Sequence, residues 1–147
     1  MAATISTNNG LFKGKMLDYY YVRRAESAIG GDQFILARAA FGTSSLVTQS
    51  STQNGWVIAD IPPDFKKSDL HSRFAECPLV LSLSGANINI SATLSDSDLA
   101  DDAPHNLNTM ILLDNKGEAV AVLCCQQDTV YRGKVFQAMM TIEQRAS

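Results

Sequence analysis

The sequence predicts an α+β fold, in which one N-terminal helix packs on a mostly antiparallel β-sheet or a small β-sandwich. Two patterns support this prediction. In the last third, two apolar runs are separated by a turn sequence and followed by another strand-like stretch, over residues 107–113, 118–125 and 129–143. Such an order is typical of a β-meander that ends the chain. Near the start, a proline-free segment lies between a polar sequence and two glycines, as in many helices.

The helix is expected over about residues 9–29. Residues 7–9, Thr-Asn-Asn, are good N-cap residues, and apolar residues follow from Leu11 at three- and four-residue spacings. The pair Gly30-Gly31 supplies a helix C-terminus. A strand competes for residues 19–22, because tyrosine and valine favour β-structure. The signals at both ends of the segment favour the helix.

The rest of the chain, about residues 34–143, is expected to be rich in strands within one domain that spans residues 1–147. Strands are predicted at 34–41, 56–61, 79–83 and 86–94, ahead of the meander, with loops at 42–55 and 95–105 and a helix at 64–76. The strand at 86–94 alternates apolar and polar residues, which predicts one buried face, and Ser84-Gly85 before it is a plausible tight turn.

The charge pattern argues against binding to nucleic acid. The net charge is −3, the isoelectric point is about 5.2, and the basic residues are scattered rather than arranged in a stripe. The first ten residues have neither the basic nor the apolar region of a signal peptide, and no stretch approaches the roughly 18 apolar residues of a membrane span. We therefore expect synthesis in the cytoplasm and no membrane partner.

The cysteines Cys77, Cys124 and Cys125 do not indicate a disulfide framework, because their number is odd and two are adjacent. On a strand, neighbouring side chains point to opposite faces. One of the adjacent pair is therefore expected to be buried and the other half exposed. No basic neighbour in the sequence lowers a thiol pKa, so the pattern indicates structural cysteines in a reducing cytoplasm.

No motif indicates a catalytic site, a cofactor or a metal. The carboxylates at 96, 98, 101 and 102 lack the glycine and the late glutamate of a calcium loop, which favours a solvated acidic loop. The two histidines, His71 and His105, stand far apart and without a partner at ligand spacing, so zinc is not expected. Nucleophile-elbow and phosphate-binding glycine motifs are absent from the sequence.

The residues most typical of a protein interface are Tyr19, Tyr20, Tyr21, Arg23 and Arg24. Tyrosine and arginine are enriched at interface hot spots, because they bury a large rigid area and still form polar contacts. On a helix, three adjacent tyrosines point in different directions, so at least one is expected outside the core. These five residues form the candidate assembly interface. The alternative is a purely structural role, with two tyrosines buried and the arginine stems lying along the surface.

Four short sequences occur in an order known from one family: residues 7–11, 42–44, 61–63 and 112–122. In this order the chain resembles the N-terminal, virion-attachment region of tail-collar-type phage tail fibre proteins. That family has a Thr-x-Ala-Gly-Leu start, a Gly-Asp-Gly-like turn, an Ile-Pro segment and a closing Gly-Leu-Tyr-Asp-x-x-Gly hairpin. The chain departs from it at 42–44, which lacks Asp-Gly, at 110–113, which replaces Gly-Leu-Tyr, and at Ser147, where a fibre would continue into a shaft.

The resemblance implies a non-enzymatic structural protein of a phage tail or a related contractile machine, located in the virion. Such a protein joins a fibre or fibre-like element to the baseplate, binds other tail or baseplate proteins, and is usually a homo-oligomer, often a trimer. Two alternatives remain open. One is a small soluble enzyme with a site assembled around Cys77, His71 or the loop 96–102. The other is a soluble adaptor or inhibitor that binds one protein.

Overall fold

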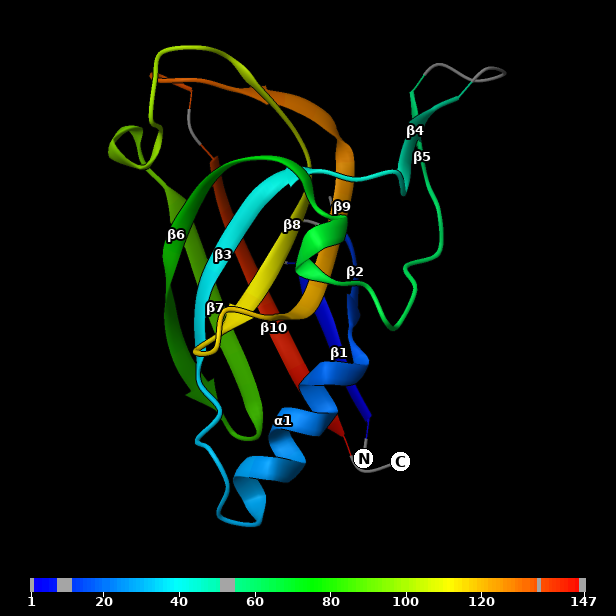
Figure 1. The fold of residues 1–147 in the computed structure, drawn as a ribbon, viewed down its shortest axis with the longest axis vertical. Helices are drawn as coiled ribbons and strands as arrows, with labels where there is room; N and C mark the ends of the chain where they lie inside the picture. The colour runs from blue at the N-terminus through cyan, green and yellow to red at the C-terminus, as the bar shows by residue number, and fades with distance from the viewer. Residues whose placement is uncertain (1, 8–11, 51–54, 135, 146–147) are drawn as a thin grey trace.

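The structure is a computed structural model that describes residues 2–7, 12–50, 55–134 and 136–145. Its elements are β1 (Ala2–Thr7), β2 (Lys13–Met16), α1 (Asp18–Ala28), β3 (Leu36–Thr43), β4 (Val47–Gln49), β5 (Trp56–Ile58), η1 (Lys67–Asp69), β6 (His71–Ser84), β7 (Asn87–Leu94), η2 (Asp96–Asp98), β8 (His105–Asp114), β9 (Ala119–Val130) and β10 (Phe136–Arg145). The fold is mostly β, and α1 is the one α-helix in these ranges (Figure 1). No helix there is both long enough and apolar enough to cross a membrane.

The eight long strands form one antiparallel sheet in the order β1-β10-β7-β6-β3-β8-β9-β2. The sheet curls until its two end strands, β1 and β2, approach each other, which makes a nearly closed barrel (Figure 1). The close approach explains Gly14 in β2, because a Cβ there would lie 2.8 Å from Cγ2 of Ile5 in β1. The expected helix on an antiparallel sheet is thus present, and the sheet has the form of a barrel.

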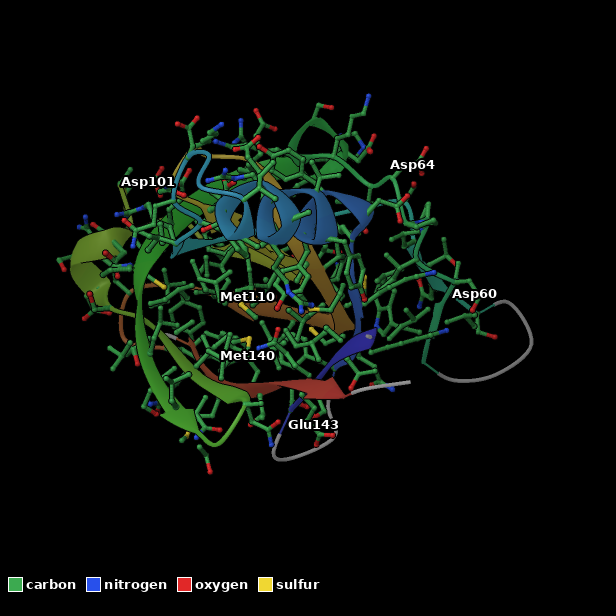
Figure 2. All side chains as sticks on the ribbon, turned by 90° about the horizontal axis from the view of Figure 1, so that it is seen from below. Asp60, Asp64, Asp101, Met110, Met140 and Glu143 are labelled. Carbon is green, nitrogen blue, oxygen red and sulfur yellow. The ribbon has the colours of Figure 1, made fainter. Side chains whose placement is uncertain are left out.

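Strands β8 and β9 are buried on both faces. Their inward residues, such as Met110 and Leu123, join Met140 of β10 in the barrel interior, where Figure 2 shows Met110 and Met140. Their outward residues pack under β4, β5 and the segment 61–70; these residues are Ile111, Leu113, Ala119, Val122 and Cys124. Burial on both faces explains why the two strands are continuous apolar runs in the sequence.

The predicted C-terminal meander is only half correct. β8 and β9 form the expected hairpin, and Gly117 in its turn has a φ of 80°. The third stretch, β10, does not lie beside β9, because it pairs with β1 and β7. The free edge of β9 is instead taken by β2. The N-terminal strands therefore close the barrel at the place where a meander would have put β10.

The N-terminal helix is confirmed, but it begins later than predicted. Residues 13–16 form β2, which pairs with β9, and α1 begins at Asp18. Residues 9–11 of the predicted helix lie outside the described residues. Tyr19 to Val22 are helical, as preferred, and the helix ends before Gly30, whose φ is 85°. The first part of the segment is a strand because its backbone completes the ladder of β9, a contact that local spacing does not reveal.

The helix predicted at 64–76 is wrong. Only the short turn η1 forms there, and β6 begins at His71 and pairs with β3. The segment 42–55, predicted as a loop, contains the last two residues of β3 and the whole of β4. The strand predicted at 56–61 ends earlier, at Ile58. For β6 and the end of β3, a partner strand far along the chain decides the conformation, whereas β4 and β5 pair with each other as a local hairpin.

The hairpin between β6 and β7 is confirmed. Ser84 pairs with Asn87 across a two-residue turn, in which Gly85 has a φ of 63°. Ile90 and Ala92 point into the core, as the alternation predicts.

Candidate assembly surfaces

Helix α1 lies across one end of the barrel and is anchored there by Tyr20. The Tyr20 side chain is buried, and its ring packs edge-on against Phe34 at 5.5 Å. Its hydroxyl donates to Oε1 of Gln144 in β10 at 3.1 Å. Burial raises the pKa of this phenol, so it stays protonated and remains a donor. Tyr20 therefore belongs to the core and is not available to a partner.

Tyr21 ties the helix to the first strand. Its hydroxyl donates to the carbonyl of Ala3 and accepts the Ala3 amide hydrogen, each at 3.2 Å. Its ring is half-buried and lies edge-on to Tyr20 at 5.4 Å. The role of Tyr21 in the fold is thus to clamp β1 against α1.

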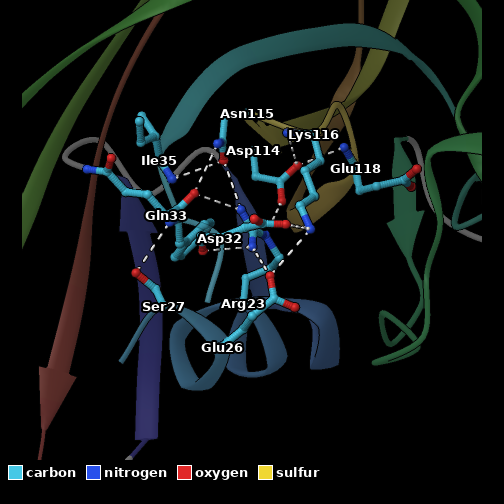
Figure 3. A network of polar contacts seen from close by, with 11 residues as sticks. Arg23, Glu26, Ser27, Asp32, Gln33, Ile35, Asp114, Asn115, Lys116 and Glu118 are labelled. Atoms are coloured by element: carbon cyan, nitrogen blue, oxygen red, sulfur yellow. Dashed lines mark hydrogen bonds and ion pairs between the residues drawn. The ribbon is translucent and has the colours of Figure 1, made fainter. Parts of the chain in front are cut away.

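Arg23 is the centre of a polar network that locks the helix to the turn between β8 and β9 (Figure 3). Its side chain is 1% exposed, and Nε donates to Oδ2 of Asp114 at 2.8 Å. The remaining guanidinium hydrogens go to Glu26, to the carbonyls of Asp32 and Gln33, and to Oδ1 of Asn115. The hydrogen bond to Asp114 raises the pKa of Arg23, so the cation is permanent.

Asp114 also shapes the turn that receives the helix. Its Oδ1 accepts the amide hydrogens of Lys116 and Glu118, both at 3.0 Å. Lys116 reaches back to Asp32 at 2.9 Å and to Glu26 at 3.3 Å. The Asp114 carboxylate thus neutralises the buried Arg23 cation and also accepts two amide hydrogens of the turn.

Tyr19 lies on the side of α1 that faces the segment after β5. It lines a small cleft with Val22, Phe65 and Ala119, whose rim carries the carboxylates of Asp18, Asp64 and Glu118 and the amine of Lys66. None of these three carboxylates forms an ion pair with another described residue. Burial and the nearby charge of Asp114 raise the pKa of Tyr19. We call this feature the acidic cleft.

The five residues predicted as an interface therefore separate into different roles. Tyr20 and Arg23 are interior, and Tyr21 is occupied by β1. Arg24 is half-buried, with its guanidinium 5.4 Å from the ring centre of Tyr20. Tyr19 alone of the tyrosines reaches the acidic cleft. Val22 and Phe65 were not predicted as interface residues. Val22 lies three positions after Tyr19, so these two residues share one face of the helix, and this spacing was the available signal.

A second exposed apolar region lies on the hairpin of β6 and β7 and on neighbouring β10. Val80, Leu83 and Met139 are more than half exposed. Val80 and Met139 both pair with Ser91, so their side chains lie in one row on the outer face, whereas Leu83 pairs with Ile88 and lies on the other face, next to the turn. No residue of this region was predicted as an interface. The available signal was the absence of charge from residue 77 to residue 95.

Two of the groups considered for an enzymatic site, His71 and Cys77, lie apart from each other. His71 and Cys77 are six positions apart on β6, a separation of roughly 20 Å along a strand. In the loop 96–102, Asp101 pairs with His105 and Asp102 pairs with Arg132. Over the described parts of the chain, no three His, Cys, Asp or Glu side chains are grouped so that they could hold a metal ion.

All three cysteines are free and buried. One cysteine of the adjacent pair was expected to be half exposed. This prediction is wrong, because β9 is covered on both faces and both Cys124 and Cys125 are buried. Burial raises the pKa of Cys77 to about 11 and that of Cys125 to about 12, and it also raises the pKa of Cys124. A raised pKa keeps a thiol protonated and therefore poorly nucleophilic.

We expect the three thiols of the folded chain to resist a thiol-specific reagent such as DTNB at about pH 8, where an exposed cysteine is partly thiolate. In guanidinium chloride, all three should react rapidly. A spectrophotometric thiol count over time checks both results. Rapid reaction of a thiol in the native chain would favour the enzyme alternative built around Cys77.

The comparisons with known proteins agree on one family. The family model described as bacteriophage P1 tail fiber protein R matches residues 1–147. Tail fiber protein R of Escherichia phage P1 is 40% identical over 139 residues, which cover 94% of this chain and 94% of that protein. No solved structure matches. The match supports the coarser expectation of a phage tail fibre protein, through the family of protein R and not through the tail-collar-type fibres of the resemblance.

Proposed function

Because this chain belongs to the bacteriophage P1 tail fiber protein R family, we propose that it is a non-enzymatic structural protein of a phage tail that joins a fibre or fibre-like element to the baseplate. Membership over the whole chain is the observation that carries this proposal. The chain acts in the virion tail as an attachment part, as the resemblance to tail-collar-type fibres implies. Its partners are other tail or baseplate proteins and further copies of itself.

The acidic cleft is the docking site that the geometry supports best for a tail partner. Its walls are fixed, because α1 is held by Tyr20 and by the network of Arg23, and so Tyr19 and Val22 are presented on a rigid support. A rigid apolar pocket loses little conformational freedom when a partner binds. Its size suits one or two apolar side chains.

The rim of the acidic cleft selects the partner by charge. Three carboxylates and one amine surround the apolar walls, which leaves a local excess of negative charge. A partner segment with an apolar anchor next to lysine or arginine complements this arrangement, whereas an acidic segment is repelled. We therefore assign the cleft to a basic, apolar-anchored segment of a neighbouring tail protein.

Deletion of the gene from the parent phage, with variants supplied from a plasmid, tests the proposal. Virions made with the doubly substituted chain Tyr19→Ala, Val22→Asp should contain about 30-fold less of the chain than virions made with the wild type. That loss corresponds to about 2 kcal/mol at an interface hot spot. The amount in purified virions is measured by quantitative immunoblotting.

The matched control is Ile29→Asp, which also replaces an exposed apolar residue of the helix region by an acid but lies beyond the cleft. This variant should be incorporated normally. If the wild-type chain is absent from purified virions, the structural role is wrong and the adaptor alternative gains weight. If the cleft variant is incorporated like the wild type, another surface carries the attachment.

A further inference from the structure

Strand β6 changes its partner halfway along its length. Its first half pairs with β3, and the last of these pairs is Arg38 with Pro78. From Leu79 onward β6 pairs with β7, while the chain before Arg38 turns toward β8. Among the described residues, no strand pairs with the edge of Leu79–Ser84 that faces away from β7. We call this edge the open β6 edge.

The hairpin geometry identifies the backbone groups on the open β6 edge. Ser84 and Asn87 flank a two-residue turn with a glycine of positive φ at its first position, so they exchange both of their hydrogen bonds. In an antiparallel ladder this pattern alternates. Leu79, Leu81 and Leu83 therefore direct their amide hydrogens and carbonyls away from β7, to the open side.

The open β6 edge lacks the protection that natural edge strands carry. Its six residues, Leu-Val-Leu-Ser-Leu-Ser, include no lysine, no other charge and no proline. Val80, Leu81 and Leu83 are 71%, 40% and 76% exposed. A flat apolar edge without charges is a template for strand addition.

We propose that the open β6 edge pairs with the same edge of a second copy of this chain, in antiparallel register. The distribution of charge favours a second copy as the partner of this edge. The chain carries a net charge of −3, but residues 77–95 carry none, so two copies meet there without repulsion. The inference concerns the purified chain and does not rest on the proposed place in the virion.

Side-chain parity supports the same pairing. Residues opposite each other in a ladder point to the same face. If Leu81 faces its own counterpart across a two-fold axis, Leu79 faces Leu83 of the other copy. All the leucines of the edge then gather on one face and bury each other. Such an isologous contact closes as a dimer, in contrast to the trimer that the family resemblance implies.

The contact is small, because six strand residues extend only about 20 Å. Interfaces at the small end of the range are weak, so we expect a monomer–dimer equilibrium that depends on concentration. Light scattering coupled to gel filtration measures the mass of the chain in solution. Concentrations of roughly 10 and roughly 300 µM lie below and above the dissociation constant expected for a weak dimer. The mass should rise from that of the 15.9 kDa chain toward twice this value.

The test variant is Leu83→Lys, which puts a charge on the edge at a position that is largely solvent-exposed, so the fold is retained. The matched control is Ile29→Lys, which makes the same kind of change at an equally apolar and exposed position away from the edge. Leu83→Lys should stay monomeric over the whole range, and Ile29→Lys should behave like the wild type. A wild-type chain that stays monomeric, or any oligomer that survives Leu83→Lys, overturns the inference.

Amide hydrogen exchange provides a second readout that does not depend on a variant. In the single chain the amides of Leu81 and Leu83 pair with no described strand on the open side, so they should exchange rapidly at low concentration. At high concentration they should become protected, as backbone hydrogen bonds form between copies. Exchange rates that are the same at both concentrations would contradict strand pairing.

Discussion

Replacement of Asp114 by alanine is expected to lower the free energy of unfolding by about 3–5 kcal/mol, because it removes one partner of a buried ion pair. The side chain of Asp114 is 0% exposed, and that of Arg23 is 1% exposed. Without the carboxylate the guanidinium stays buried with one anion fewer, and the turn loses the acceptor for two amide hydrogens. Urea denaturation followed by circular dichroism measures the change.

Two further variants separate the contributions. Asp114→Asn keeps an oxygen for the turn but removes the charge, so its effect should lie between those of the wild type and alanine. Glu26→Ala removes a half-exposed partner of the same arginine and should change stability by less than about 1 kcal/mol. If Asp114→Ala is as mild as Glu26→Ala, the network does not hold the helix on the barrel.

Tyr20→Ala is the second substitution with a large expected effect, about 3–5 kcal/mol, which is usual when a buried aromatic ring is removed. Tyr20 is 1% exposed, and its ring fills the space between α1, Phe34 and the barrel end. The loss should include the anchoring of the helix, so the near-ultraviolet dichroism of the tyrosines should weaken as well. The same denaturation experiment measures the stability.

Tyr20→Phe and Tyr19→Ala serve as controls for this prediction. The phenylalanine variant keeps the ring and loses the hydroxyl with its hydrogen bond to Gln144, which should cost about 0.5–1.5 kcal/mol. Tyr19→Ala should lower stability less than Tyr20→Ala, because Tyr19 is only partly buried and lines a surface cleft, yet it should weaken incorporation into the virion. Equal destabilisation by Tyr19→Ala and Tyr20→Ala would mean that both tyrosines are core residues.

Elements with strong local signals were predicted well. The helix over Tyr19 to Ala28 ends at a glycine that takes a positive φ, and both hairpin turns contain such a glycine. These signals act over a few residues, so the sequence displays them directly. The helix predicted at 64–76 failed, because Phe74 and its neighbours are held in β6 by β3, a partner about thirty residues away.

The candidate site was predicted in part. Composition singled out the segment of Tyr19 to Arg24, and the structure places this segment at the junction of helix, barrel and turn. Which of its members face a partner depends on the direction of each side chain around the helix and on what covers it. Spacing alone did not reveal that Arg23 points inward to Asp114, ninety-one positions later.

The amino-acid sequence by itself determined the apolar runs of β8 and β9, the turns at Gly85 and Gly117, and the helix end at Gly30, because glycine and apolar residues act through local backbone freedom and burial. Only the tertiary structure decided that β10 lies beside β1 and β7, that Arg23 is interior, and that Leu79–Ser84 is an open edge. These features depend on hydrogen bonds and packing between segments distant in the sequence, which a local pattern does not contain.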